Sequence, residues 1–102
     1  MSVVTNVILT CFPGDTGANE VFAWLYANKH GYIQQVDDQA GGHKAMECEV
    51  YLIATNMLDR DAFLFMFNAS RWEYPECAQL MMKHEQEDVF TTYIAADFEE
   101  LK

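Results

Sequence analysis

Residues 7–25, VILTCFPGDTGANEVFAWL, run from a β-type segment through a turn into a helical segment, and this order decides the fold that we expect. The first part is rich in Val, Ile, Thr and Phe, and the Pro13-Gly14 pair ends it, which is typical of a strand followed by a turn. Because VILTCF is apolar on both sides, we expect this strand in the middle of its sheet. Apolar residues then recur with the helical period, which predicts a helix capped by Asp15 or Thr16.

The glycines of this turn invite comparison with a phosphate-binding loop, but the surrounding residues do not fit one. A loop of the ATPase type needs a lysine directly after its second glycine, and no lysine or arginine lies between Gly14 and Asn28. The three-glycine spacing of dinucleotide-binding loops is also absent. Asp15 and Glu20 already place negative charge where an incoming anion would bind. We therefore interpret the loop as a turn and a helix cap.

A hairpin is expected after this first helix, which should end at the Lys-His-Gly sequence of residues 29–31. Residues 32–36 have the composition of a strand, residues 37–43 form a polar reversal, and residues 46–55 alternate in a way that predicts a half-buried strand. The even-numbered residues from Met46 to Ala54 are expected to face the core, which leaves the odd-numbered ones on the opposite face.

A second helix is expected from a cap at Asn56 or Asp59 through about Trp72. Its apolar side chains recur on one side, and this side should pack on the sheet. The expected inner residues are Ala62, Phe63, Met66 and Phe67.

Residues 76–87 allow two interpretations. Nearly all of them are good helix formers and they follow Pro75, so we interpret them as a short third helix. A strand through residues 77–82 is the alternative. Residues 89–94 are expected to form the last strand, and an acidic tail over residues 97–102 is expected outside the core.

The expected order is β-α-β-β-α-(α)-β, in a single domain that spans residues 1–102 and has its core at about residues 3–94. Helices that return the chain across an antiparallel sheet produce a two-layer α+β sandwich. This order is that of the ferredoxin-like, split β-α-β plan, here with an extra short helix before the last strand. The plan implies the strand order 4-1-3-2 with both main helices on one face.

Charge is the most unusual property of the chain, because sixteen Asp and Glu face six Lys and Arg, for a net charge of −10. Such a surface repels polyphosphate, and it is neutralisation of phosphates that gives proteins their general affinity for nucleic acids. We therefore expect no direct binding to nucleic acid. One interpretation of the charge is solubility alone. The other is a surface that imitates nucleic acid or attracts a basic protein partner.

The expected strand order brings acidic residues from three loops to one edge of the sheet. One interpretation of this acidic edge is a divalent-cation site with oxygen ligands, but the sequence pattern of a calcium-binding loop is absent. The interpretation that we favour is an electrostatic docking edge for a basic protein. The residues assigned to the acidic edge are Asp15, Asp37, Asp38, Glu85, Glu87 and Asp88.

Cysteine usage and hydropathy bear on the compartment and on cofactors. Cys11, Cys48 and Cys77 form an odd, widely spaced set, unlike the disulfide frameworks of small secreted domains or the paired spacing of zinc sites. The longest strongly apolar stretch, residues 62–67, is far too short to span a membrane, and the amino terminus does not have the pattern of a secretory signal. We expect a cytoplasmic protein that uses no metal and no cofactor and does not interact with membranes.

The sheet face opposite the helices is expected to be open, because a two-layer sandwich covers only one face of its sheet. Tyr51 and Ile53 are odd-numbered residues of the second hairpin strand, so we expect them on this open face. An apolar patch in that place would be covered by a partner or by a second copy of the chain. Homodimerisation through the open sheet face is therefore expected.

The sequence favours a small acidic binding protein over an enzyme, because it contains no recognisable catalytic motif. Such a protein would dock on a basic protein surface, in the manner of an inhibitor or a nucleic-acid-mimicking accessory protein of a phage or mobile element. The alternative is a small enzyme or ligand-binding domain, dimeric, with a pocket between helices and sheet.

Overall fold

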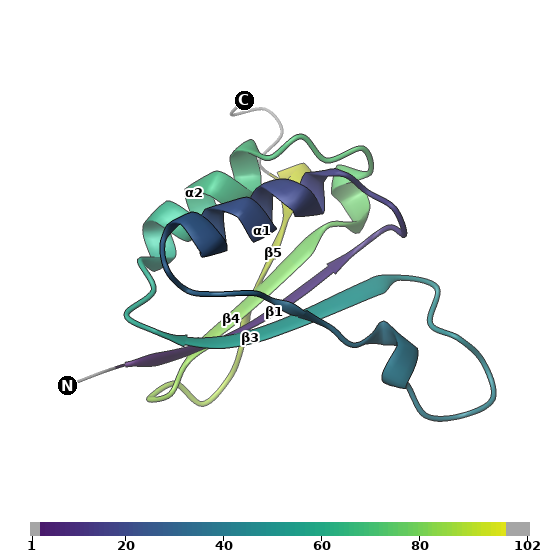
Figure 1. Ribbon diagram of the computed structural model, residues 1–102, viewed down its shortest axis with the longest axis horizontal. Coiled ribbons are helices and arrows are strands. Elements are labelled where there is room, and N and C mark those ends of the chain that lie inside the picture. Colours follow the sequence, from purple (N-terminus) through teal and green to yellow (C-terminus); the bar gives the residue numbers. More distant parts are fainter. Residues whose placement is uncertain (1–2, 98–102) are drawn as a thin grey trace.

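Two helices cover one face of a five-stranded antiparallel sheet in the computed structural model, which describes residues 3–97 (Figure 1). The strands are β1 (Val4–Cys11), β2 (Gln34–Gln35), β3 (Glu49–Asn56), β4 (Gln79–His84) and β5 (Thr91–Ile94). The helices are α1 (Gly17–Ala27) and α2 (Arg60–Ala69), with two short 3-10 helices, η1 (Asp37–Gln39) and η2 (Pro75–Cys77). This arrangement confirms the expected α+β class. The strand order is β2-β3-β1-β4-β5.

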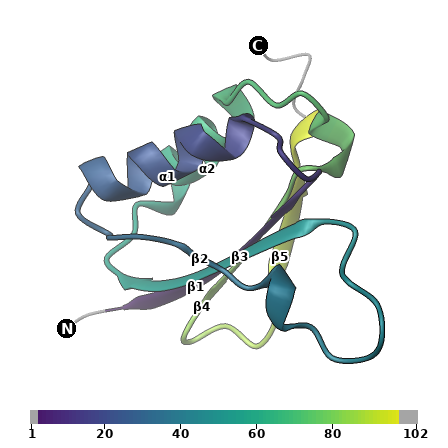
Figure 2. The same ribbon diagram turned by 45° about the vertical axis from the view of Figure 1, so that its right-hand side comes forward.

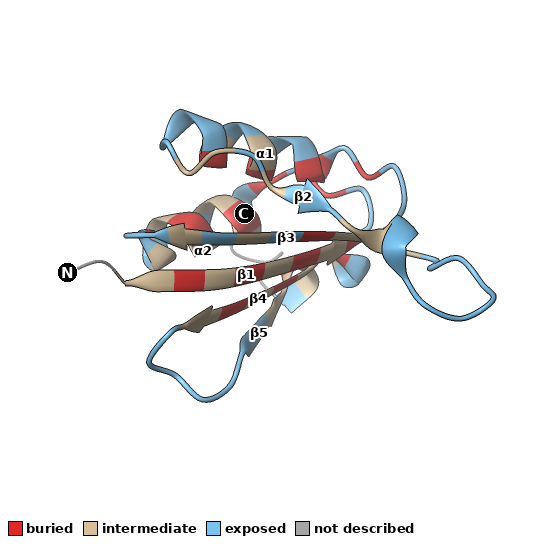
Figure 3. Cartoon of the chain, turned by 60° about the horizontal axis from the view of Figure 1, so that its bottom comes forward, coloured by how far each residue is buried: buried red, intermediate tan, exposed pale blue. Residues whose placement is uncertain are grey.

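β1 lies in the middle of the sheet, as its apolar sequence predicts, and pairs with β3 on one side and β4 on the other. Its residues alternate between the two faces. The helix-covered face of β1 is fully buried, and the other face is half-buried. Figure 3 shows this alternation as stripes along the central strands. The fully buried residues of β1 are Thr5, Val7, Leu9 and Cys11.

The ferredoxin-like strand order 4-1-3-2 is not confirmed, because β4 lies between β1 and the last strand. Residues 79–84, which we interpreted as part of a helix, form this strand, so the third helix is wrong and the strand alternative holds. Leu80 and Met82 are buried under the helices, and backbone pairing with both neighbours outweighs the helical preference of the segment. Pro75 begins only the single turn η2.

The faces of β3 are the reverse of those expected. Tyr51 is buried and Ile53 packs against the core, whereas Leu52 and Ala54 are exposed on the other face. The Tyr51 ring lies 4.9 Å from that of Phe22 in α1, so the larger ring fills the space under the helix. Residues 50–54 are apolar or aromatic on both sides, so their alternation alone did not show which side is inner.

The two helices begin close to the predicted caps. The Asp59 carboxylate accepts the Ala62 backbone N–H at 3.1 Å and caps α2, whereas α1 begins after Thr16 without a bond from the threonine side chain. α2 ends at Ala69, three residues before the expected end, because Ser70 adopts an extended backbone. Phe63 and Phe67 are the inner residues of α2 that are fully buried, and Ala62 and Met66 are partly buried.

One close contact joins the start of α1 to the segment after α2. A Cβ atom built on Gly17 would lie 2.6 Å from the Trp72 ring and 3.0 Å from its Cα, closer than real side chains approach. Trp72 is itself buried against Phe67, and its indole N–H donates to the Phe67 carbonyl at 2.9 Å. Glycine is therefore required here by the space that the tryptophan occupies.

Residues 40–48 form an exposed loop between η1 and β3 that extends away from the rest of the molecule (Figures 1 and 2). Within residues 3–97, no helix is long and apolar enough to cross a membrane. Most of the predicted acidic tail lies outside the described residues, which end at Asp97.

Candidate functional site

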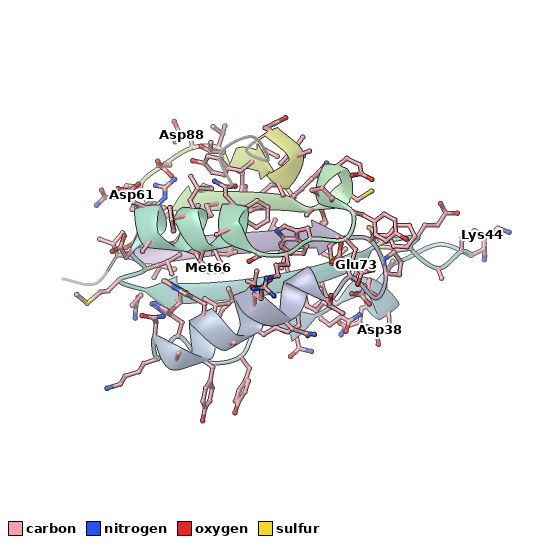
Figure 4. The ribbon with its side chains drawn as sticks, turned by 90° about the horizontal axis from the view of Figure 1, so that it is seen from above. Asp38, Lys44, Asp61, Met66, Glu73 and Asp88 are labelled. Carbon is pink, nitrogen blue, oxygen red and sulfur yellow. The ribbon has the colours of Figure 1, made fainter. Side chains whose placement is uncertain are left out.

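The six residues assigned to the acidic edge do not lie together, and that prediction is wrong. β4 runs antiparallel to β1, with Gln79 opposite Thr10 and His84 opposite Thr5, so the loop after β4 lies beside the start of β1. Asp15 follows the other end of β1, and η1 lies at that end too, because the Asp37 carboxylate accepts the N–H of Val50. Figure 4 shows this separation, with Asp38 and Glu73 near one end of the sheet and Asp61 and Asp88 near the other.

Asp15 is a structural residue. The residue is only 4% exposed, and its carboxylate accepts three backbone N–H groups, from Gly17 at 2.9 Å, Glu73 at 3.1 Å and Tyr74 at 3.0 Å. The charge is thus satisfied by fixed donors, as burial of a carboxylate requires. Asp15 ties the start of α1 to the segment between α2 and β4, and it is not available to a partner.

The two acidic residues of η1 differ in their roles. Asp37 accepts the Val50 N–H at 3.0 Å, and this hydrogen bond holds the pKa of its carboxyl below the usual value. Asp38 is exposed, and no other side chain or backbone group of residues 3–97 bonds to it. Of the three predicted residues at this end of the sheet, Asp38 alone presents an unoccupied carboxylate.

The acidic residues after β4 order their own loop. Glu85 accepts the Val4 N–H at 3.0 Å, and Glu87 accepts the His84 N–H at 2.8 Å and pairs with Arg60 at 3.3 Å. The His84 N–H first, and then Arg60, hold the pKa of Glu87 below its usual value. Asp88 is exposed, and the described part of the chain offers it no partner.

A partly buried polar cluster that the sequence did not predict lies where β1 meets β3. Glu49 accepts the Tyr51 hydroxyl at 2.8 Å and the Gly14 N–H at 3.3 Å, and its Oε1 lies 3.8 Å from the Cys11 sulfur. Burial, followed by the Glu49 charge, raises the pKa of Cys11 to about 12. Burial, followed by the hydrogen bond to Glu49, also raises the pKa of Tyr51. Both groups stay protonated near neutrality, so the cluster supplies no nucleophile.

Cys11 and Cys77 are therefore expected to react with iodoacetamide at very different rates. Cys77 is exposed, whereas Cys11 is buried and holds its proton. At pH 8 a pKa near 12 in place of 9.0 lowers the thiolate fraction about 1,000-fold. Mass spectrometry of the alkylated peptides should show Cys77 modified first and Cys11 modified only when denaturant is added. Equal rates at these two positions would contradict the burial of Cys11.

An open hollow of about 510 Å³ lies between α2 and the β4–β5 edge. Two of its polar side chains are engaged, because Asp59 caps α2 and Arg60 pairs with Glu87. The Nε2 atom of His84 is buried and makes no hydrogen bond within the described chain. Among residues 3–97, no group of three or more His, Cys, Asp or Glu side chains is placed to hold a metal ion. The residues that line the hollow are Leu58, Asp59, Arg60, Asp61, Leu64, Met82, His84 and Tyr93.

The most prominent exposed group at the carboxyl end of β1 is a pair of aromatic rings. Phe12 and Tyr74 have ring centroids 4.2 Å apart and are 43% and 40% exposed. Glu49 accepts the N–H of Gly14, two residues after Phe12, and Tyr74 is preceded by Glu73 and followed closely by Glu76 in the chain. We call Phe12, Tyr74, Glu49, Glu73 and Glu76 the aromatic–acidic end.

None of these five residues was assigned to a site from the sequence, because Glu49, Glu73 and Glu76 are not among the six residues of the predicted acidic edge. Phe12 directly follows β1 and Tyr74 directly precedes Pro75, far apart in the chain. Only the return of the chain from α2 to β4 brings them together. Comparison with protein-family models, with curated proteins and with solved structures finds no match to this chain.

Proposed function

We propose that this protein is a small, non-enzymatic acidic binding module that docks on a basic surface of another protein through its aromatic–acidic end. The observation that carries the proposal is the exposed Phe12–Tyr74 pair, whose tyrosine lies between Glu73 and Glu76 in the chain. Aromatic rings with a polar surround are typical anchors of protein interfaces. Arginine and lysine side chains bind both to ring faces and to carboxylates, so a basic surface suits this end best.

The charge of the whole molecule supports the same partner class. Arg60–Glu87 is the one ion pair that residues 3–97 contain, so the excess of acidic residues is hardly neutralised within the chain. A protein of this charge attracts basic surfaces over distances comparable with the Debye length, about 10 Å at 0.1 M salt. Exposed carboxylates with no hydrogen bond or ion pair inside residues 3–97 are Asp38, Glu47, Asp61, Glu76, Asp88 and Asp97.

The target in this proposal is a protein whose basic groove otherwise binds nucleic acid, and the module acts by occupying that groove. Competition follows from shared chemistry, because phosphates and carboxylates bind the same arginine and lysine side chains. The net charge of −10 supports this target, because it makes the module too acidic to bind nucleic acid itself.

Binding of an arginine-rich peptide provides a direct test. In amide NMR spectra of the protein, we expect added peptide to shift the cross-peaks of Phe12 and Tyr74. Raising the salt concentration from about 50 mM to about 300 mM should weaken binding several-fold. The variant E73Q/E76Q should bind about tenfold more weakly, because two rim carboxylates are lost. Tyr74→Ala should lower affinity by about tenfold or more, as expected for an interface anchor.

The matched control is D61N/D88N, which removes the same charge at the opposite end of the sheet. Asp61 and Asp88 are exposed and unpaired within the described residues, so the fold should not change. The control should lower affinity less than threefold. Binding that is indifferent to salt, or equal losses in the two double variants, would refute docking through the aromatic–acidic end.

A further inference from the structure

The face of the sheet opposite the helices carries little charge, and about half of its strand residues are apolar. No element covers it within the described residues, and Figure 1 shows both helices on the other side. Among the strand residues of this open face, Lys83 alone is charged, on a chain whose net charge is −10. The strand residues on the open face are Val4, Asn6, Ile8, Thr10, Gln34, Val50, Leu52, Ala54, Asn56, Gln79, Met81, Lys83, Thr92 and Ile94.

The open face contains both a hollow and apolar side chains at its rim. The hollow has a volume of about 510 Å³, and its apolar lining comes from Ile8, Leu52 and Ala54, with Phe90 at one side. Phe90 belongs to the loop between β4 and β5, where its neighbour Val89 is 72% exposed. Figure 1 shows this loop extending below the sheet, on the side away from the helices. A cavity and an apolar projection thus lie on the same surface.

We propose that this open face binds the same face of a second copy of the chain, with Val89 of each copy inserted into the hollow of the other. In a twofold interface the same surface of each copy must contain both complementary groups of a contact. The open face meets this requirement, because it contains both the exposed Val89 side chain and the hollow. Burial of Val89 and Leu52, both exposed in the single chain, supplies the apolar contact.

Lys83, the one charged strand residue of this face, disfavours a basic partner there, and the net charge of −10 disfavours nucleic acid. Lys83 pairs with Asn6 across the sheet, and Asn6 lines the hollow, so the one cation of the face lies at the edge of the cavity. Asp88 immediately precedes Val89 and is exposed and unpaired within residues 3–97. Insertion of Val89 therefore brings Asp88 of one copy toward Lys83 of the other, and the arrangement occurs twice in the dimer.

The size of the face suits a weak dimer. The five strands have eight, two, eight, six and four residues, and at about 3.3 Å per residue and about 4.8 Å between strands the sheet covers about 440 Å². Two copies thus bury about 900 Å², the size of a weak or transient interface. A dissociation constant in the micromolar range is expected from such an area.

Analytical ultracentrifugation from about 5 μM to about 500 μM tests the proposal, because a micromolar dimer dissociates within this range. The unmodified chain should pass from a mass of 11.7 kDa to twice that value. Leu52→Lys should stay monomeric at concentrations where the unmodified chain is dimeric, because it places a second cation at the hollow. Leu52 is 40% exposed, so its replacement should leave the thermal unfolding temperature nearly unchanged.

Two further variants make the result specific. Phe65→Lys is the matched control, since Phe65 is 76% exposed on α2, on the opposite side of the molecule, and it should dimerise as the unmodified chain does. Lys83→Asp should weaken the dimer about tenfold, and the exchange K83D/D88K should restore it. A chain that is monomeric at every concentration would overturn the proposal, and this outcome would mean that another partner occupies the face. Equal dimerisation of the Leu52 and Phe65 variants would overturn it as well.

Discussion

Replacement of Asp15 by alanine is expected to destabilise the protein by about 3–5 kcal/mol, the largest effect of any acidic residue in the chain. The substitution leaves three backbone N–H groups, those of Gly17, Glu73 and Tyr74, without their acceptor. Each buried donor that loses its partner costs about 1–3 kcal/mol. The loss is a large fraction of the total stability of about 5–15 kcal/mol that is usual for a single domain.

Urea denaturation followed by circular dichroism measures this effect, and two further variants define its cause. Asp15→Asn keeps an oxygen at the Oδ1 position, which accepts from Gly17 and Glu73, but presents an amide to the Tyr74 N–H. Its loss should therefore be smaller, about 1–3 kcal/mol. Asp38→Ala removes an exposed carboxylate and should change stability by less than about 0.5 kcal/mol. Similar values for the alanine variants at 15 and 38 would show that Asp15 is not a buried acceptor.

Phe67→Ala is the second substitution with a large expected effect, also about 3–5 kcal/mol. Phe67 is fully buried, and its ring packs on Trp72 with centroids 5.5 Å apart. Removal of the ring creates a cavity between α2 and the sheet, and the surrounding backbone can close it only in part.

Phe65→Ala is the matched control, because it makes the same chemical change two residues away on the same helix. Phe65 is 76% exposed, so the same gain in helix propensity is accompanied by almost no loss of packing. We expect a change within about 0.5 kcal/mol, measured from the urea midpoints of the two variants. Comparable destabilisation by both substitutions would mean that α2 does not present Phe67 to the core.

The order strand, turn, helix at residues 7–25 was predictable because its signals are local. The apolar run of β1, the Pro13-Gly14 turn and the period of α1 each act within a few residues, and all of them agree. The secondary structure of residues 79–84 depends instead on pairing with β1, which lies far away in the sequence. Helix formers such as Leu80 and Met82 become strand residues there because the sheet offers paired backbone and burial on one face.

The same segment explains why the acidic edge was predicted wrongly. With a helix at residues 76–87, the acidic loop after it would have entered the last strand at the carboxyl end of β1. Because β4 takes the place beside β1, this loop lies at the opposite end of the sheet. Sequence also reveals how many carboxylates there are but not which of them bind backbone N–H groups, so Asp15 was assigned to a surface from which it is absent.

Prediction of the open face failed at Tyr51 and Ile53 for a different reason. In β3 both faces carry apolar side chains, so a shift of one position changes which set is buried without changing the pattern. The Tyr51–Glu49 hydrogen bond and the contact of Tyr51 with Phe22 favour burial of the face that carries Tyr51. Neither interaction can be inferred from the local sequence pattern. The expectation of an open apolar face stays a prediction, now assigned to Leu52 and its neighbours.

The close approach of Gly17 and Trp72 has a consequence for recognising relatives of this protein in sequence data. A side chain at position 17 and an indole at position 72 compete for one volume, so the two positions should change together. A relative with alanine or serine at position 17 should carry a smaller ring or an aliphatic residue at position 72. Such paired changes at positions 17 and 72 would identify distant relatives that share this helix–turn junction, even where loop lengths differ and overall sequence identity is low.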